Sequence, residues 1–251
     1  TLAWPGPGCR ERVEHMLLRY PADRRTLAWA VAMPVVALIP YLRPELAVWL
    51  CPLSCYLALS AGVIAHNHNH TPTFRDRKLN GVLGNWLSIF YGYPTFAWVP
   101  THNLNHHKFV NKAGDATITW RHTNKHNALV AATYFFVSSW YQSEPIRDYI
   151  QKAKEKNPEL YRTIVGQYVF FVGTHLALLT LAIAMHGWRL GFLVWGMMFL
   201  IPALFALWTI MLFNYIQHVH TDPWSEHDHS RSFVGRVLNF LLFNNGLHSA
   251  H

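Results

Sequence analysis

The sequence is poor in charge, in cysteine and in the motifs of soluble hydrolases. Charged side chains make up 14% of its 251 residues, against about 25% in an average soluble domain. Three cysteines are too few for a disulfide framework, and they form no C-x-x-C zinc pair. There is no H-E-x-x-H or G-x-S-x-G motif, which argues against a zinc protease and a serine hydrolase. E-x-x-H spacing occurs once, at Glu226 and His229, whereas a carboxylate di-iron bundle needs it twice.

In place of charge, the chain has long apolar runs. Hydrophobic residues make up 51% of it and aromatic residues 15%. A membrane-crossing helix needs about 20 mostly apolar residues, and none of the four best runs contains Lys or Arg inside it. We therefore predict four spans, at about residues 26–42, 46–65, 163–185 and 190–213.

Two further uncharged runs are too broken or too short to be predicted as spans. Residues 79–101 contain three glycines and two prolines, and residues 127–143 are short. Both are rich in Trp and Tyr, which favour the membrane interface. We predict interfacial helices for both runs, followed by a solvated helix over 144–162 that leads into the third span.

The positive charges indicate the orientation. Lys and Arg number 21 against 13 acidic residues, a net charge of +8. With four spans, all of these cations except Arg43 and Arg189 lie on one side of the membrane, which is the cytoplasmic side by the positive-inside rule. This distribution favours a membrane over a nucleic acid as partner. The predicted fold is an all-α integral membrane protein with four transmembrane helices, interfacial helices and a cytoplasmic histidine-rich cap.

Histidines gather where the predicted spans end on this side. Several pairs are three or four residues apart, so that both rings share one helix face. One zinc ion takes four ligands at most, so eight imidazoles suit two metals of intermediate softness, with iron the best candidate. The predicted ligands are His66, His70, His102, His106, His107, His218, His248 and His251.

Metal-bound histidines usually need a partner for the second ring nitrogen. Candidates for this outer shell are Asp115, Asp222, His68 and His220. Two other classes of protein also join spans to histidines. A metal transporter would hold them along a path at mid-membrane with acids, and a haem-binding electron carrier would use His175, which has no partner at matching depth.

The segments "HNHNH", "HNLNHH" and "NNGLHSAH" resemble the three histidine boxes of the membrane fatty acid desaturase and hydroxylase superfamily. The match covers residues 26–251 in order and topology. The resemblance implies one desaturase-like domain over 1–251, with a di-iron centre on the cytoplasmic face. It assigns the eight histidines above as ligands and Asn214 as the holder of a metal-bound water. That family's third box continues with another histidine after His251, so the resemblance implies a fragment that ends inside this box.

The resemblance also implies a reaction. Two irons would use O2 to oxidise an alkyl chain, because an unactivated C–H bond resists acid–base chemistry. We expect a fatty-acyl desaturase, with hydroxylation or ketolation of a lipid, alkane or carotenoid as the alternative. An apolar channel would hold the chain, lined by aromatic residues such as Phe90, Tyr91, Trp98 and Phe213. Electrons would come from an external ferredoxin, rubredoxin or b-type cytochrome.

Overall fold

The computed structural model describes residues 17–248, and its regular structure there is helical. An isolated β-bridge joins Leu18 and Phe74. The α-helices are α2 (Arg24–Leu42), α3 (Ala47–His70), α4 (Arg77–Tyr91), α5 (His107–Phe109), α6 (Ala128–Lys156), α7 (Pro158–Trp195), α8 (Ile201–His218) and α9 (Arg236–Leu241). Short 3-10 turns η1 (Pro21–Asp23), η2 (Pro44–Leu46) and η3 (Thr95–Ala97) and π-helical segments η4 (Val99–His106) and η5 (Gly196–Leu200) complete the described elements.

Three helical segments of the described chain are long and apolar enough to cross a membrane. They are Pro21–Leu42, Pro44–His70 and Pro158–His218. The third contains both of the expected runs 163–185 and 190–213, and it is broken at Gly187, whose φ of 76° and ψ of 166° are not helical. Large apolar side chains remain exposed along these segments, among them Trp49, Val169, Trp188 and Leu204. Such a large exposed apolar surface is typical of a membrane protein.

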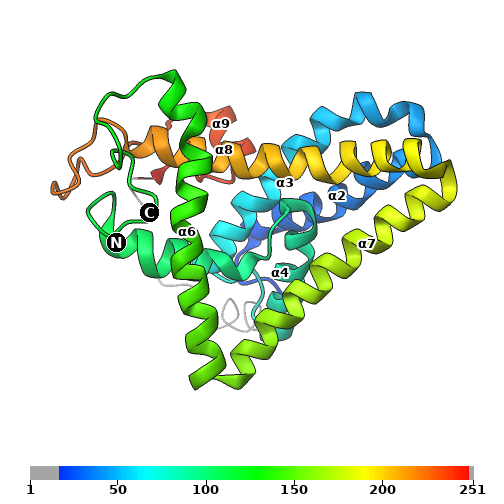
Figure 1. Cartoon of the computed structure of the whole chain (residues 1–251), viewed down its shortest axis with the longest axis horizontal. Helices are drawn as coiled ribbons and strands as arrows, with labels where there is room; N and C mark the ends of the chain where they lie inside the picture. Colours follow the sequence, from blue (N-terminus) through cyan, green and yellow to red (C-terminus); the bar gives the residue numbers. More distant parts are fainter. Residues whose placement is uncertain (1–16, 249–251) are drawn as a thin grey trace, which may run out of the picture.

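The chain reverses direction twice at the same end of this bundle. One reversal is η2, between α2 and α3, and the other is Gly187. The ring of His186 donates a hydrogen bond to the Tyr41 carbonyl at 2.9 Å, so the two reversals lie side by side. Figure 1 shows both at one end of the molecule, while the carboxyl ends of α3 and α8 lie toward the other.

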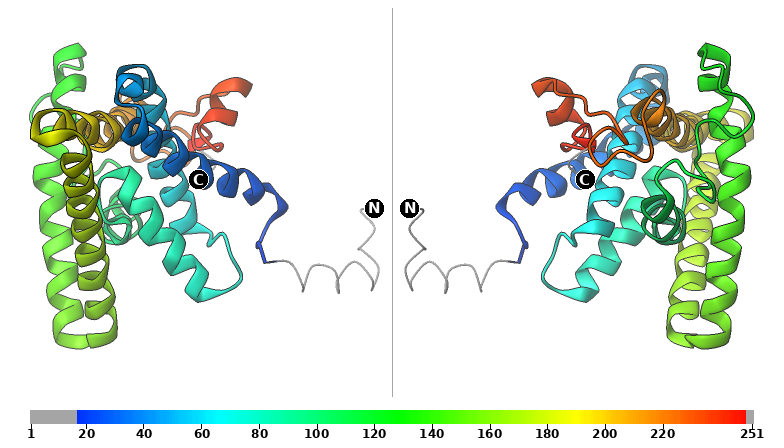
Figure 2. Two further views of the ribbon diagram at one scale, coloured as in Figure 1. Left: turned by 90° about the vertical axis from the view of Figure 1, so that its right-hand side faces the viewer. Right: turned by 90° about the vertical axis from the view of Figure 1, so that its left-hand side faces the viewer.

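The segments predicted to lie at the interface are helical, but their boundaries differ from the prediction. Helix α4 ends at Gly92, which has φ 87°, so the run 79–101 is divided. Helix α6 continues through Pro145 to Lys156, and Asn157 then caps α7. Residues 144–162 are helical apart from the turn at Asn157, but they are not a separate helix, because 144–156 continue α6 and 158–162 begin α7. Figures 1 and 2 show α6 running across the direction of α8 and pairing with α7.

Close packing of α3 against α8 brings two histidine-bearing helix ends together. Ala61, Ala65 and Ala206 are fully buried here. A Cβ added to Gly62 would lie 2.6 Å from the Tyr91 ring and would also overlap the Ile210 side chain. Small residues allow helices of this kind to approach closely, so His66 on α3 and His218 on α8 end up at one end of the same pair.

We expect Gly92→Ala to destabilise the protein by about 2 kcal/mol or more. A left-handed backbone costs a non-glycine residue about 1–2 kcal/mol, and the added Cβ would overlap the Ala203 side chain on α8. Gly81→Ala is the matched control, since Gly81 lies inside α4 and its Cβ would meet nothing within 4 Å. Alanine there gains helix propensity of up to about 1 kcal/mol. Thermal unfolding in detergent measures both; equal melting temperatures would contradict the argument.

Candidate metal centre

Four histidines form the first group, which joins α3 to the π-helical segment η4 and to α5, which follows it directly. His66 is buried, and its Nε2 lies 2.8 Å from Nε2 of His102. Nε2 of His107 lies 3.0 Å from the same His102 atom. The ring of His70, one helical turn beyond His66, is centred 5.0 Å from that of His107. His66, His70 and His102 offer nitrogens within 4.8 Å of one another, so they are a candidate metal site.

The second group joins η4 to α8 and to the segment after α9. His106, His218 and His248 offer ring nitrogens within 4.8 Å of one another. Nε2 of His218 lies 2.9 Å from Nε2 of His248, and the ring of His106 is centred 4.8 Å from that of His218. The two groups are adjacent, because the rings of His102 and His106 stack with centroids 5.3 Å apart.

The π-helical geometry of η4 distributes its histidines between the two groups. The sequence predicts an ordinary helix, with His106 sharing a face with His102 and His107 turned away by about 100°. A π-helix turns less per residue, and residues five apart approach one face. The ring centroids of His102 and His107 consequently lie 4.5 Å apart, while the neighbouring His106 ring packs against that of His218. One short segment therefore serves both groups.

Hydrogen bonds hold two of these rings through the nitrogen that faces away from the group. His106 Nδ1 lies 2.9 Å from Asp115 Oδ2, and His218 Nδ1 lies 3.1 Å from the His229 carbonyl. Because a carbonyl or carboxylate oxygen can only accept a hydrogen bond, both Nδ1 atoms carry the ring proton. Both Nε2 atoms therefore keep a lone pair that can bind a metal. Partners of this kind orient metal ligands and raise their basicity.

The surroundings of His102 on η4 and of His107 on α5 keep both imidazoles neutral. Burial lowers the pKa of His102 well below its ordinary value, and the neighbouring His66, His106 and His107 lower it further. Partial burial lowers the pKa of His107 to about 4, with contributions from His106 and His70. Neutral imidazole is the form that binds a metal, so these rings are ready as ligands at neutral pH.

Asp115 is the centre of a buried network that supports the second group. Burial alone would raise its pKa, but hydrogen bonds from His106, Thr117 and the Asn111 backbone lower it to about 2. Its Oδ1 accepts from the Thr117 backbone and hydroxyl, both at 2.7 Å, and its Oδ2 accepts from the Asn111 N–H at 2.7 Å. Asn111 also donates to the His218 carbonyl at 3.2 Å. The sequence predicted Asp115 as an outer-shell candidate, whereas neither Asn111 nor Thr117 carried a sequence signal.

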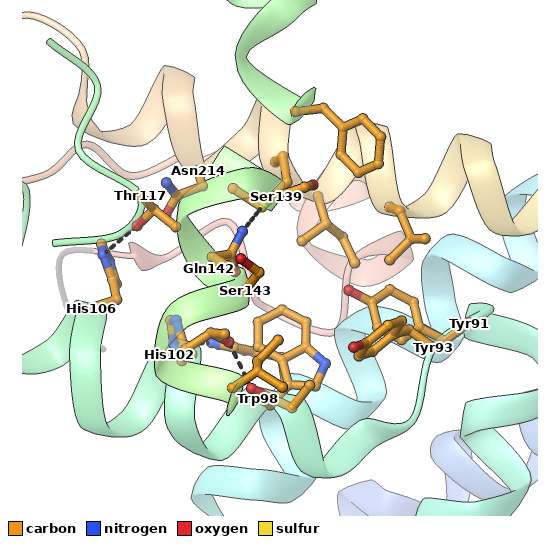
Figure 3. A pocket seen from close by; sticks show the side chains of 18 of the residues that line it. Tyr91, Tyr93, Trp98, His102, His106, Thr117, Ser139, Gln142, Ser143 and Asn214 are labelled. Atoms are coloured by element: carbon orange, nitrogen blue, oxygen red, sulfur yellow. Dashed lines mark hydrogen bonds between the residues drawn. The ribbon is translucent and has the colours of Figure 1, made fainter. Parts of the chain in front are cut away.

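Asn214 lies beside this network on α8, and its orientation follows from the hydrogen bonds of Tyr134. The buried Tyr134 hydroxyl has one proton, which it donates to the Thr117 carbonyl. Its oxygen must then accept from Asn214, whose Nδ2 lies 2.8 Å away. The Oδ1 atom of Asn214 is left to face the cavity that this residue lines, on the side of His106 and Thr117 (Figure 3).

We expect Tyr134→Phe to destabilise the protein by about 1–3 kcal/mol, because it removes the shared partner of the Asn214 amide and the buried Thr117 carbonyl. The matched control is Tyr215→Phe. Tyr215 is also buried and packs on Tyr134, but its hydroxyl bonds to His126 away from the histidine groups. Thermal unfolding is the measurement, and a larger loss in the control would contradict this assignment.

The other predicted site residues that the structure describes lie outside the two groups. His68 Nδ1 bonds to Thr73 at 2.9 Å. The His220 ring packs on His126, and Asp222 accepts from the Trp224 N–H in a loop. His175, the candidate haem ligand, donates to the Ile89 carbonyl between helices. His251 lies outside the described residues.

A cavity of about 500 Å³ leads away from the histidines between α6 and α8. His66, His102, His106 and His248 line it at one side. Figure 3 shows His102 and His106 across the cavity from Tyr91 and Tyr93. Of the predicted aromatic channel, Tyr91, Trp98 and Phe213 line the cavity. Phe90 instead packs against Trp86 and Phe199.

Clustered histidines at one end of a bundle of apolar helices define a membrane protein with a candidate metal centre. The chain belongs to the fatty acid desaturase family, whose model, described as "Fatty acid desaturase", matches residues 44–251. This confirms the resemblance inferred from the histidine motifs. A curated "Fatty acid desaturase" of Bacillus subtilis (strain 168) is 25% identical over 224 aligned residues, covering 75% of this chain and 58% of that relative. The chain thus spans just over half the relative's length. No solved structure matches the chain.

Proposed function

We propose that the chain is an O2-dependent lipid oxidoreductase with a di-iron centre, and that it desaturates an acyl chain. The observation that carries this proposal is the convergence of ring nitrogens from α3, η4 and α8 into two adjacent groups. Family membership supports a desaturase- or hydroxylase-type reaction on a lipid. Two irons and O2 would supply the oxidising power that an unactivated C–H bond demands.

The donor set fits two metal ions. Metal–imidazole bonds are about 2.0–2.1 Å long, so two nitrogens that bind one ion must lie within about 4.2 Å of each other. The Nε2 pairs here are separated by 2.8, 3.0 and 2.9 Å. Imidazole suits iron as well as other transition metals. In this proposal His66, His70, His102 and His107 would hold one iron, His106, His218 and His248 would hold the other, and His251 would complete the set.

The chain's own residues would orient and protect this centre. Asp115 and the His229 carbonyl would hold two imidazoles with Nε2 toward the metal. The Oδ1 atom of Asn214 would accept a hydrogen bond from a metal-bound water. The apolar cavity walls of α8 and α4 would exclude bulk water and keep the acyl chain beside the histidines.

We also propose four spans in one domain, with the histidine groups on the cytoplasmic face. The break at Gly187 would divide the third apolar segment into two crossings. The positive-inside count leaves two cations on the far side of the membrane, Arg43 and Arg189. Both lie near the chain reversals at η2 and Gly187. An external ferredoxin, rubredoxin or b-type cytochrome would deliver electrons to that cytoplasmic face.

The hydroxylase remains the second candidate for the same centre. A transporter is less well supported, since both groups occupy helix ends rather than a path through the bundle. The haem carrier is also less well supported, since His175 is engaged with Ile89 between helices.

The test is metal and product analysis of the full-length protein expressed with a reductase system. We expect about two irons per chain and a product two mass units lighter than the substrate. A gain of sixteen mass units would identify the hydroxylase. Zinc, a single metal, or a Soret absorption band would overturn the di-iron proposal.

A further inference from the structure

The short helix α9 presents a strip of apolar side chains to the outside of the molecule. Its exposed apolar residues, with the one that precedes the helix, are Val234, Val237, Leu238, Phe240 and Leu241. Val237 is 74% exposed, whereas Asn239, which points to the opposite side of the helix, is buried. Figure 2 shows α9 on the side of α2, away from α6 and α7. A surface that faces water rarely gathers apolar side chains in this way.

Contacts with α2 and α3 fix the level at which α9 lies along the bundle. Arg25, in the first turn of α2, donates to the Phe240 carbonyl at 3.0 Å, and the ring of Trp29 packs on that of Phe240 with centroids 6.1 Å apart. Tyr56 of α3 donates to another carbonyl of α9 at 3.3 Å. Because Tyr56 precedes His66 by ten residues, this contact lies about 15 Å from His66 along the helix axis. Helix α9 is therefore set back from the histidines, beside the start of the first span.

The surroundings of α9 at this level are apolar on one side and basic on the other. Val31 and Val35 of α2 are 64% and 55% exposed, within a segment that is long and apolar enough to cross a membrane. Arg24 and Arg236 are exposed cations at the beginnings of α2 and α9. The sequence between residues 230 and 248 contains no Asp or Glu. Apolar side chains with neighbouring arginines are typical of a helix that lies in the plane of a membrane surface.

Helix α9 also belongs to a compact segment that leads to His248. The Asn244 N–H donates to the Asn239 carbonyl at 2.8 Å, and the Phe233 N–H donates to the Gly246 carbonyl at 2.7 Å. These bonds close residues 233–247 into one unit, directly before the histidine. Anything that fixes the position of α9 therefore fixes this unit as well.

We propose that α9 is a membrane anchor whose apolar face enters the cytoplasmic leaflet of the lipid bilayer. Arg24 and Arg236 bind the phosphate groups of the lipids, and the bilayer holds the segment that leads to His248. The inference rests on the proposed four-span topology, and it adds a lipid-binding surface outside the histidine groups and the cavity. The bilayer is the occupant that the level of α9 favours, since the neighbouring apolar surface of α2 is the one that faces lipid in that topology.

The experiment measures the depth of α9 in the full-length protein, reconstituted in nanodiscs of phosphatidylcholine and phosphatidylglycerol. A nitroxide spin label is attached to Val237→Cys after the native cysteines are replaced by alanine. Collisions of the label with apolar O2 and with a polar nickel chelate are measured by paramagnetic resonance. Val31→Cys is the reference for lipid, and Glu226→Cys, at an exposed charged position in a loop, is the reference for water. We expect the O2-to-nickel collision ratio at residue 237 to be severalfold above that at residue 226.

Each other outcome has a definite meaning. A water-like ratio at residue 237 with a lipid-like ratio at residue 31 would overturn the anchor alone, whereas water-like ratios at both would overturn the topology. Few collisions with either reagent at residue 237 would show that protein covers α9, which also overturns the proposal. The measurement needs no metal, so a failure of the di-iron proposal would appear separately.

A second measurement tests whether the bilayer holds the segment before His248. Val237→Asp places a carboxylate where the proposal places lipid, and a charge there is costly. We expect it to speed amide hydrogen exchange of residues 238–247 severalfold in nanodiscs. Asn244→Asp, which adds the same charge at an exposed position of the same segment, is the control. Equal exchange rates in the two variants would overturn the role of the bilayer in holding this segment.

Discussion

Replacing His102 with alanine is expected to remove one of the two proposed metal ions and to lower activity by more than about a hundredfold, since losing even an outer-shell partner costs about 10–100-fold. His102 Nε2 lies within 3.0 Å of ring nitrogens of both His66 and His107, so it is the residue that joins α3 to η4 in that group. Metal analysis should show the iron content falling from about two to about one per chain, because His106, His218 and His248 are retained.

His68→Gln is the matched control for this substitution. His68 lies on α3 between His66 and His70, yet its ring bonds to Thr73 rather than to either histidine group. The control should keep both irons and its activity. If His102→Ala kept two irons while His68→Gln lost them, the division of the histidines into these two groups would be wrong.

The second large effect is expected for Asp115→Asn. The carboxylate accepts four hydrogen bonds, two at each oxygen, and every partner is a donor. An asparagine amide in either orientation would turn its NH2 group toward N–H or O–H donors. Lost hydrogen bonds to a buried charge cost about 1.5–3 kcal/mol each. The change should also weaken metal binding at the second group by about 10–100-fold, since His106 loses its orienting acceptor.

Chemical denaturation and metal titration measure the two consequences separately. Asp148→Asn is the control, because Asp148 is an exposed acid on α6 outside this network. A fully stable Asp115→Asn protein with normal metal affinity would show that the network does not support His106.

The apolar runs predicted the long helices, because a segment that crosses lipid must satisfy its backbone hydrogen bonds internally and a helix does so. The sequence did not reveal the connections between helices. The boundary expected after residue 143 is absent, because α6 continues through Pro145 to Lys156, and the reversal at Gly187 comes from one backbone conformation rather than from a loop-rich segment. Such connections depend on contacts with neighbouring segments, such as the hydrogen bond between His186 and Tyr41. Local composition does not encode these contacts.

For the candidate site, spacing along helices identified the histidines that the structure brings together. It could not reveal the residues around them. Asn111 has a left-handed backbone, with φ 60°, in a segment without regular structure, and it reaches His218 more than a hundred residues away. Tyr134 comes from α6, which contributes no histidine to either group. Its role follows from how α6 lies across α8, a tertiary relationship with no periodic signal in the sequence.

The π-helical turn of η4 bears on how motif spacing should be read. On an ordinary helix, residues three and four positions along lie about 60° to one side and about 40° to the other side of the starting residue. On the wider π turn, residues four and five along take up comparable flanking positions, as His106 and His107 do around His102. A chain with one residue fewer before the paired histidines can therefore present the same three rings from a plain α-helix, so that an insertion in the motif and a change of helical pitch compensate each other.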